Sequence, residues 1–217
     1  MTTDRAPTVR VPDGWNRTAS TTETLFDVRV VSVTAHTVVF EDARLADAVR
    51  DRTGADGTWR FFFASRLRLR PQSGGSTALT GLVTDRANDG FVDRLRDRGF
   101  RDAERVESRR FAVGRTEANL RRYRAAVDVG MSAGIDDDVD GGDTGVGDRP
   151  DGGPDGEGST TVTAEAYLAV WPDDGQFLVA GGAYPVRVDG ARSEAVAASL
   201  SPERHREELF ELIRSVE

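Results

Sequence analysis

Thirty residues near the middle of the chain, 131–160, cannot contribute to a hydrophobic core, and any fold of this chain must accommodate them. They hold nine glycines and nine acidic residues against one base, Arg149, so the segment alone accounts for the net charge of −8. The other 187 residues contain 28 acids and 28 bases and are charge-balanced. Since few apolar side chains could offset the entropy lost on ordering, the sequence predicts a disordered Asp/Gly-rich insert. We expect it to interrupt a single α+β domain spanning residues 1–217.

The composition excludes several classes of chemistry. Because cysteine is absent, disulfides, thiolate nucleophiles and cysteine-ligated metal centres are excluded. Lysine is also absent, since all 29 bases are arginine, and this excludes Schiff-base catalysis and a Walker-type phosphate lysine. With 24 Asp and 13 Glu, the composition resembles that of salt-adapted archaeal proteins, and the whole chain resembles uncharacterised haloarchaeal proteins. That resemblance implies no particular activity.

Neither a targeting signal nor a membrane segment is expected. Residues 1–12 lack the apolar core of a signal peptide. No apolar run approaches the roughly 18–20 residues that span a bilayer, and arginines interrupt the densest cluster, 59–69. The sequence therefore predicts a cytoplasmic protein.

The first half of the chain carries both strand and helix patterns. Residues 25–40 are rich in Val, Thr and Phe, which predicts two strands or one bent strand. A helix is expected over 42–53, where a glycine follows as a left-handed cap. Alternation over 58–70 predicts a strand with one core face and one face made mostly of arginine. Residues 77–83 fit a short strand or the approach to a helix over 85–98.

Hairpins dominate the second half. The strand-like segments 104–113 and 118–129 flank a turn that contains glycine. Beyond the insert, 162–170 and 177–186 flank Pro-Asp-Asp-Gly, a strong turn signal because proline presets its first corner. The whole pattern predicts an α+β fold with a mostly antiparallel sheet of six to seven strands and about three helices.

A helix is expected to close the chain, since Ser201 can cap it and Pro202 suits its first position. If the segments 118–129 and 161–171 are neighbouring strands, the insert is an overlong hairpin loop. Replacing residues 132–159 with a short Gly-Asn turn should then leave the fold intact.

One motif resembles a cation site. Residues 136–141, Asp-Asp-Asp-Val-Asp-Gly, copy the opening of a calcium loop, in which alternate carboxylates converge on the ion. The copy then fails, because Gly147 stands where such a loop needs a bidentate glutamate and no helical pattern flanks it. A solvated linker accounts for the acidic run better, and no metal site is assigned.

No catalytic arrangement is recognisable. His36 falls at the predicted strand bend, and His205 falls on the closing helix, where a packed histidine is the ordinary interpretation. Ser65 and Ser108 lack the glycines of a nucleophile elbow. We therefore assign no catalytic, cofactor-binding or metal-ligating residue, and no cofactor is expected.

Glycine pairs and tryptophans favour structural roles. The pairs at 74–75 and 181–182 lack phosphate-loop spacing, and the second predicts a bulge or a close backbone approach within a strand. Trp15, Trp59 and Trp171 are expected to anchor packing and not a cofactor.

Arginines recur on several predicted strands, at Arg66, Arg68, Arg70, Arg109, Arg110, Arg121, Arg122 and Arg124. If these strands were neighbours, they would form a basic face suited to phosphate or nucleic acid. Cross-strand ion pairs are the simpler interpretation, because the same strands carry Glu104, Glu107, Glu117 and Glu165. The charge balance also lacks the basic excess of nucleic-acid binders, so no nucleic-acid binding is expected.

The second half contains a strand through Tyr123 and Val127, a hairpin over 166–171 and 177–180, and a helix ending at 212–216. This order resembles the Mog1 and PsbP type of α/β/α sandwich, from residue 103 to the end. The resemblance implies an antiparallel sheet with helices on both sides. It also implies an adaptor or assembly role, since such proteins are mostly non-catalytic.

These patterns together favour a non-catalytic binding or assembly module with a protein partner. The alternative is a small-ligand carrier or an enzyme whose pocket is built from residues far apart in sequence. A deep pocket with convergent polar groups and shifted pKa values would favour the carrier or enzyme. A flat apolar patch would favour the protein partner.

Overall fold

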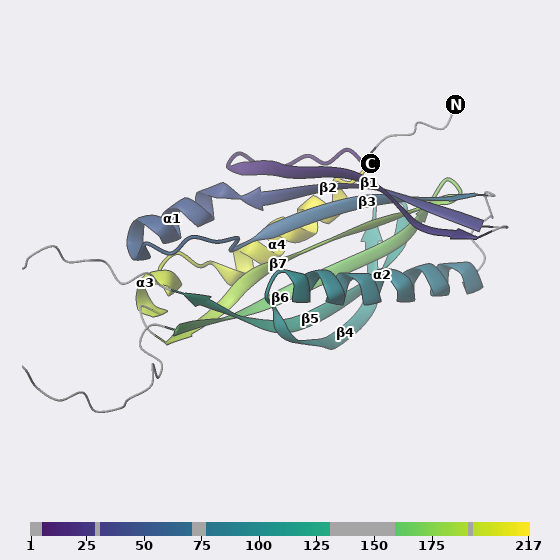
Figure 1. The fold of residues 1–217 in the computed structure, drawn as a ribbon. Helices are drawn as coiled ribbons and strands as arrows, with labels where there is room; N and C mark the ends of the chain where they lie inside the picture. The colour runs from purple at the N-terminus through teal and green to yellow at the C-terminus, as the bar shows by residue number, and fades with distance from the viewer. Residues whose placement is uncertain (1–5, 29–30, 71–76, 131–158, 191–192) are drawn as a thin grey trace, which may run out of the picture.

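Seven strands join into one antiparallel sheet in the order β1-β2-β3-β7-β6-β5-β4 (Figure 1). The computed structural model describes residues 6–28, 31–70, 77–130, 159–190 and 193–217. Its strands are β1 (Trp15–Val28), β2 (Val31–Asp42), β3 (Phe61–Arg70), β4 (Arg101–Val113), β5 (Thr116–Gly130), β6 (Ser159–Asp173) and β7 (Gln176–Gly190). Its helices are α1 (Ala43–Thr53), α2 (Thr77–Asp97), α3 (Ser193–Ala197) and α4 (Pro202–Arg214). The predicted α+β fold is confirmed.

Local turn signals place the hairpins correctly. Gly114 has φ 58° between β4 and β5, and Asp174 and Gly175 have positive φ between β6 and β7. The strand pattern over 25–40 belongs to the hairpin of β1 and β2, although β1 begins earlier, at Trp15. The short helix α3 was not predicted from the sequence.

Helices cover both faces of the sheet (Figure 1). On one face, α4 packs Leu209 and Leu212 in a cluster with Phe62. On the other, α2 packs Phe91 against Phe63, with their ring centroids 5.8 Å apart. The helices α1 and α3 form a smaller apolar cluster at the sheet end where β5 stops and β6 starts. Three layers result, with the sheet in the middle.

Of the two interpretations of 77–83, the short strand is wrong, because these residues already belong to α2, which begins at Thr77. Leu79 and Val83 pack on the same apolar cluster as Ala87 and Phe91. Their four-residue spacing gives one continuous helical stripe over the sheet. Burial of this stripe outweighs the glycines within the helix and the turn signal near residue 90.

The prediction of an arginine face along the strand over 58–70 is also wrong in part. In β3, Phe62 and Ala64 are buried beneath α4, so both faces of this half of the strand belong to the core. Its neighbours are β2 and β7, which separates Arg66 from the arginines of β4 and β5. Strand order, which hydrophobic alternation does not encode, decides this outcome.

Two adjacent glycines in β7 lie where other chain segments come close. A Cβ on Gly181 would meet the carbonyl oxygen of Tyr167, and one on Gly182 would meet that of Phe61. The predicted close backbone approach at 181–182 is confirmed.

The insert predicted over 131–160 falls almost entirely outside the described residues, as does the motif at 136–141. The strands on its two sides are antiparallel neighbours, as expected, and Gly130 stands opposite Ser159 in their register.

The pairing of Gly130 with Ser159 shifts the replaceable segment by one residue from the predicted 132–159, to 131–158. Replacing residues 131–158 with a Gly-Asn turn is expected to preserve a cooperative thermal transition. The two flanking residues are already paired, so a two-residue connection can join them. Circular dichroism melting of the shortened chain and the full chain tests this expectation. A broad, non-cooperative transition in the shortened chain would show that the segment supports the fold.

Candidate ligand-binding site

One cavity, which we call the end cleft, has a volume of about 390 Å³. It lies between the connection from α1 to β3 and the ends of β5, β6 and β7, where α2 stops. Its principal lining residues are Trp59, Phe61, Arg98, Phe100, Val127 and Asp128. Five segments that are distant in sequence therefore build this cavity.

The walls of the end cleft are aromatic and aliphatic, with one cation. Trp59, Phe61 and Phe100 are largely buried and present only small parts of their surface to the cavity. The Arg98 guanidinium lies 4.4 Å from the Phe61 ring centroid and pairs with Glu41 at 3.2 Å. This arrangement holds a charged group against the apolar wall.

Hydrogen bonding around the end cleft leaves one buried donor without a partner. Asp128 accepts hydrogen bonds from Arg101 at 2.7 Å and from Thr161 at 2.7 Å. The hydrogen bond from Arg101 is the main reason why the pKa of Asp128 is lowered. The indole Nε1–H of Trp59 is closed off from solvent and has no acceptor. An unpaired buried donor of this kind costs about 1–3 kcal/mol.

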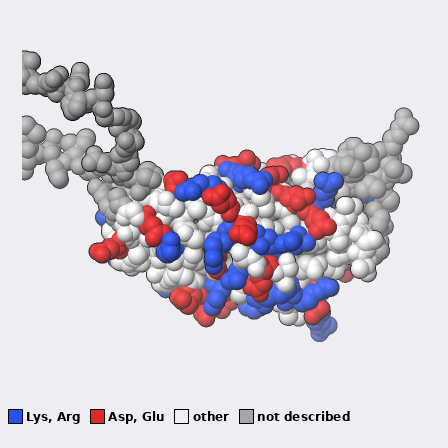
Figure 2. All heavy atoms as spheres, turned by 90° about the horizontal axis from the view of Figure 1, so that it is seen from below, with Lys and Arg blue, Asp and Glu red and all other residues white. Residues whose placement is uncertain are grey.

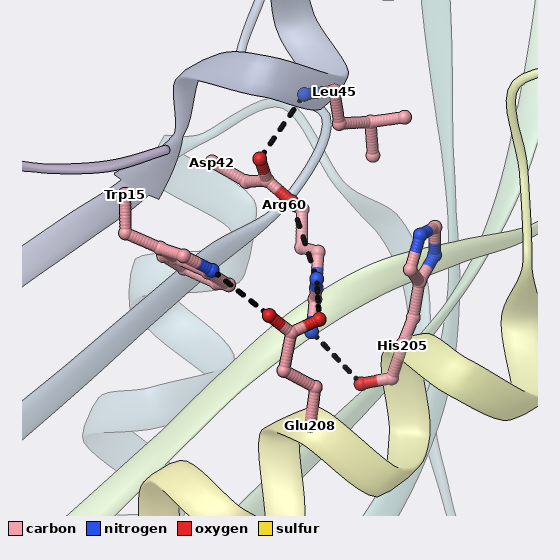
Figure 3. A network of polar contacts seen from close by, with 6 residues as sticks. All are labelled: Trp15, Asp42, Leu45, Arg60, His205 and Glu208. Atoms are coloured by element: carbon pink, nitrogen blue, oxygen red, sulfur yellow. Dashed lines mark hydrogen bonds and ion pairs between the residues drawn. The ribbon is translucent and has the colours of Figure 1, made fainter. Parts of the chain in front are cut away.

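A second cavity of about 200 Å³, which we call the arginine pocket, lies between α1 and the start of α4. Its wall contains Arg60, which is only 2% exposed (Figure 3). Arg60 Nη1 donates to Asp42 at 3.2 Å and to Glu208 at 2.7 Å, and Nη2 donates to the carbonyl oxygen of His205 at 3.0 Å. Its guanidinium also lies 4.8 Å from the Trp15 ring centroid. One buried cation thus joins β1, β2 and α4.

Both carboxylates in this network have all their oxygens engaged (Figure 3). The second oxygen of Asp42 accepts the backbone N–H of Leu45 at 3.0 Å and so caps α1. The second oxygen of Glu208 accepts the Trp15 indole N–H at 3.4 Å. The pKa of Glu208 is lowered, because hydrogen bonding and charge from Arg60 outweigh the opposing effect of burial. The network is therefore a saturated, ionised ion-pair cluster.

His205 lies beside this cluster as a neutral side chain. Burial, followed by the charge of Arg60, lowers its pKa from 6.5 to about 4. The ring makes an edge contact with Tyr184, and its Nδ1 is buried without a hydrogen-bond partner.

We expect the protein to lose stability as pH falls from about 6.5 to about 4. In this range the unfolded His205 binds a proton that the folded His205 excludes. Because the folded-state pKa is depressed, the free energy of unfolding is highest above pH 6.5. It should fall by up to about 3 kcal/mol as the pH approaches 4. Chemical denaturation of the native chain and His205→Gln at several pH values measures the effect. Equal pH slopes for the two proteins would contradict it.

A third polar cluster lies on β5, β6 and β7. Tyr167 and Tyr184 both donate to one oxygen of Glu165, at 3.1 and 3.0 Å, and Arg122 pairs with the other at 3.3 Å. Burial raises the pKa of both tyrosines, so they remain protonated donors. Arg122 also pairs with Glu107 on β4. The predicted cross-strand ion pairs are confirmed here.

Neither cavity is lined by His36, Ser65 or Ser108. His36 contacts Thr22 at 3.0 Å between β2 and β1, and the buried Ser65 contacts Thr37. Ser108 is exposed on the edge strand β4. Trp15, Trp59 and Trp171 are all buried, and Trp59 and Trp15 line the end cleft and the arginine pocket, respectively.

Sequence reasoning did not identify Arg60, Glu208, Trp59 or Arg98 as site residues. One signal for the arginine pocket was present, because Glu208 follows His205 by three residues and lies on the same helix face. No sequence signal linked Arg60 to its partners Asp42 and Glu208, since they lie 18 and 148 residues away from it.

The described part of the chain shows neither a metal-binding cluster nor a membrane-spanning helix. Its histidine, aspartate and glutamate side chains do not gather in threes as a metal ion would require. None of its helices is long and apolar enough to cross a membrane.

Comparison with known proteins gives a family match. No curated protein and no solved structure matches the chain. The model of one family, described as "Domain of unknown function (DUF6517)", matches residues 5–217. Because this match covers almost the whole sequence, the chain belongs to the DUF6517 family.

Proposed function

We propose that this protein is a non-catalytic binding module that holds a small, largely apolar molecule in the end cleft. The observation that carries the proposal is the buried, unpartnered indole N–H of Trp59 at an aromatic-walled cavity. A ligand oxygen entering from the cleft would supply the missing acceptor after a small movement of the wall.

The size and lining of the cavity support this proposal. A volume of about 390 Å³ lies within the range of small-molecule sites, which is roughly 300–1,000 Å³. Such sites combine apolar walls with a few oriented polar groups. Here Trp59 and Arg98 are the donors, so the preferred ligand has an apolar body and one oxygen that accepts hydrogen bonds.

The polar groups of the cleft favour binding over catalysis. Its described lining contains no histidine, and Asp128 is held in its ionised form by Arg101. A general base works best when its pKa lies near the working pH. A lowered carboxyl pKa therefore makes Asp128 a poor base and favours a structural role for it.

A protein partner, which the sequence favoured, has less support. The large apolar side chains exposed among the described residues are Leu25, Leu82 and Val106. They belong to β1, α2 and β4 and do not form a patch within one element. A docking surface of ordinary size needs a contiguous apolar centre.

The proposed function does not include binding to nucleic acid. On the face shown in Figure 2, acidic and basic side chains are interspersed and do not separate into a basic patch. Ion pairs account for part of this mixing, such as Arg121 with Asp85 at 2.9 Å. A gel shift with random duplex at low salt should show no complex, whereas a salt-sensitive complex would contradict this expectation.

A series of ten-carbon amphiphiles tests the proposed ligand class. Decanoate and decanol carry an acceptor oxygen, whereas decyltrimethylammonium does not. We expect the first two to raise the melting temperature and the third to leave it unchanged.

A matched pair of variants tests whether the ligand binds in the end cleft. Trp59→Phe keeps an aromatic ring but removes the N–H, and should weaken the response. Trp171→Phe alters a tryptophan buried on the α4 face and should retain it. Equal responses of both variants, or no response of the native chain to decanoate and decanol, would contradict the proposal.

We also propose that the chain is salt-adapted and related to the Mog1 and PsbP type. The absence of lysine supports the first idea, and the three-layer arrangement of helices around an antiparallel sheet supports the second. A native chain that remains folded and monodisperse in 2 M KCl, where the screening length is roughly 2 Å, would agree with salt adaptation. Aggregation there would contradict it.

A further inference from the structure

The arginine pocket contains more hydrogen-bond donors than acceptors. All four carboxylate oxygens of Asp42 and Glu208 already accept hydrogen bonds within the protein. Around them, Arg44 and Arg204 line the pocket, and neither forms an ion pair within the described residues. The hydroxyl of Ser199 is likewise buried without a partner. A ligand for this pocket must therefore bring acceptors.

The first turn of α4 adds further donors on the same side. Ser201 stands at the N-cap, but its side chain makes no capping hydrogen bond. Ser201 and Arg204 both line the pocket, so the uncapped start of this 13-residue helix borders the cavity. Pro202 at the first position carries no N–H, so the remaining first-turn N–H groups and the helix dipole are what attract negative charge at this terminus.

His205 gives a second and independent indication of a missing ligand. It is only 7% exposed, and its ring projects from α4 towards Leu45, which also lines the pocket (Figure 3). Its Nδ1 has no hydrogen-bond partner. Buried polar atoms without partners are rare in folded proteins, and each implies a group that would satisfy it.

We propose that the arginine pocket binds a small oxyanion with the chemistry of phosphate. Arg44 and Arg204 supply the positive charge, and the start of α4 supplies backbone donors. The volume of about 200 Å³ suits a free oxyanion or the phosphate of a small monoester. Arg60 does not contribute a free charge, because its two carboxylate partners outnumber it and leave that cluster with one more acid than base. This site is separate from the end cleft.

Asp13 opposes the ligand and so provides a sharp test of the charge argument. It lines the pocket, is exposed and has no ion pair within the described residues. Its negative charge should weaken anion binding, and Asp13→Asn should strengthen it.

Isothermal titration at low ionic strength with inorganic phosphate, sulfate and glycerol phosphate measures the binding. We expect saturable binding of phosphate to the native chain, weakened about tenfold by Arg44→Gln or Arg204→Gln. Asp13→Asn should tighten it. The control is Arg206→Gln, an exposed arginine of α4 that does not line the pocket, and it should leave binding unchanged. Tighter binding of glycerol phosphate than of phosphate would identify a monoester as the ligand.

Two outcomes would overturn the proposal. One is the absence of saturable binding of all three anions to the native chain. The other is equal weakening by Arg204→Gln and Arg206→Gln, which would show unspecific attraction to a basic helix. Since these arginines are exposed, the variants should fold, and circular dichroism melting in chloride verifies this before titration.

Discussion

Arg60→Met should lower the free energy of unfolding by about 3–5 kcal/mol, because it leaves two mostly buried carboxylates without their cationic partner. The side chains of Asp42 and Glu208 are only 11% and 18% exposed, and Arg60 is the cation that pairs with both. Methionine fills much of the same space but offers no donor. The loss should therefore come from uncompensated charge and not from a cavity.

Urea denaturation of Arg60→Met and the native chain at pH 7 measures this loss. Arg50→Met is the matched control, since Arg50 also pairs with two aspartates, Asp47 and Asp56, but is 49% exposed. Exposed pairs contribute about 0–1 kcal/mol, so the control should change stability little. Similar losses in the two variants would contradict the argument.

A double variant separates charge from packing. Glu208→Gln removes one of the two unpaired negative charges and keeps an acceptor for the Trp15 indole. Combined with Arg60→Met, it should recover part of the lost stability, because fewer charges then lie buried without a partner. If the double variant is less stable than Arg60→Met alone, the network stabilises the fold by packing instead.

The sequence predicted those parts of the fold that depend on near neighbours. Hydrophobic alternation and the turns at Gly114 and 172–175 gave the strands and hairpins, because both signals act over a few residues. The start of α2 was missed, since Gly81 and the Asn-Asp-Gly near residue 90 are strong local signals for turns. Packing of Leu79 and Val83 on the sheet overrode them.

The candidate sites depend on distant contacts and could not be predicted in this way. The end cleft needs Trp59 beside Val127 and Phe100, which meet only when β3 and β5 take their places in the sheet. Arg60 looked like one more arginine in a strand pattern, and its partner Glu208 lies at the other end of the chain. The strand order that joins these residues is a property of the whole fold.

Gly182→Ala should destabilise the protein by at least about 3 kcal/mol, although alanine adds a single methyl group. That methyl would collide with the carbonyl oxygen of Phe61 on the paired strand β3, and it would lie 3.1 Å from Leu209 of α4. A side chain could rotate away, but a backbone carbonyl within a sheet cannot. Relief of the collision would require β7 to separate from β3, at the point where the two halves of the sheet join.

The same substitution in α2 provides the control. Gly90 is exposed in the helix interior, and a Cβ there has no neighbour within 4 Å. Gly90→Ala should therefore stabilise the protein by about 0.5–1 kcal/mol, because alanine loses less backbone entropy in a helix. Urea denaturation of both variants should give changes of opposite sign. A small loss for Gly182→Ala would mean that β3 and β7 can separate locally at little cost, and that the join between the two halves of the sheet is adaptable.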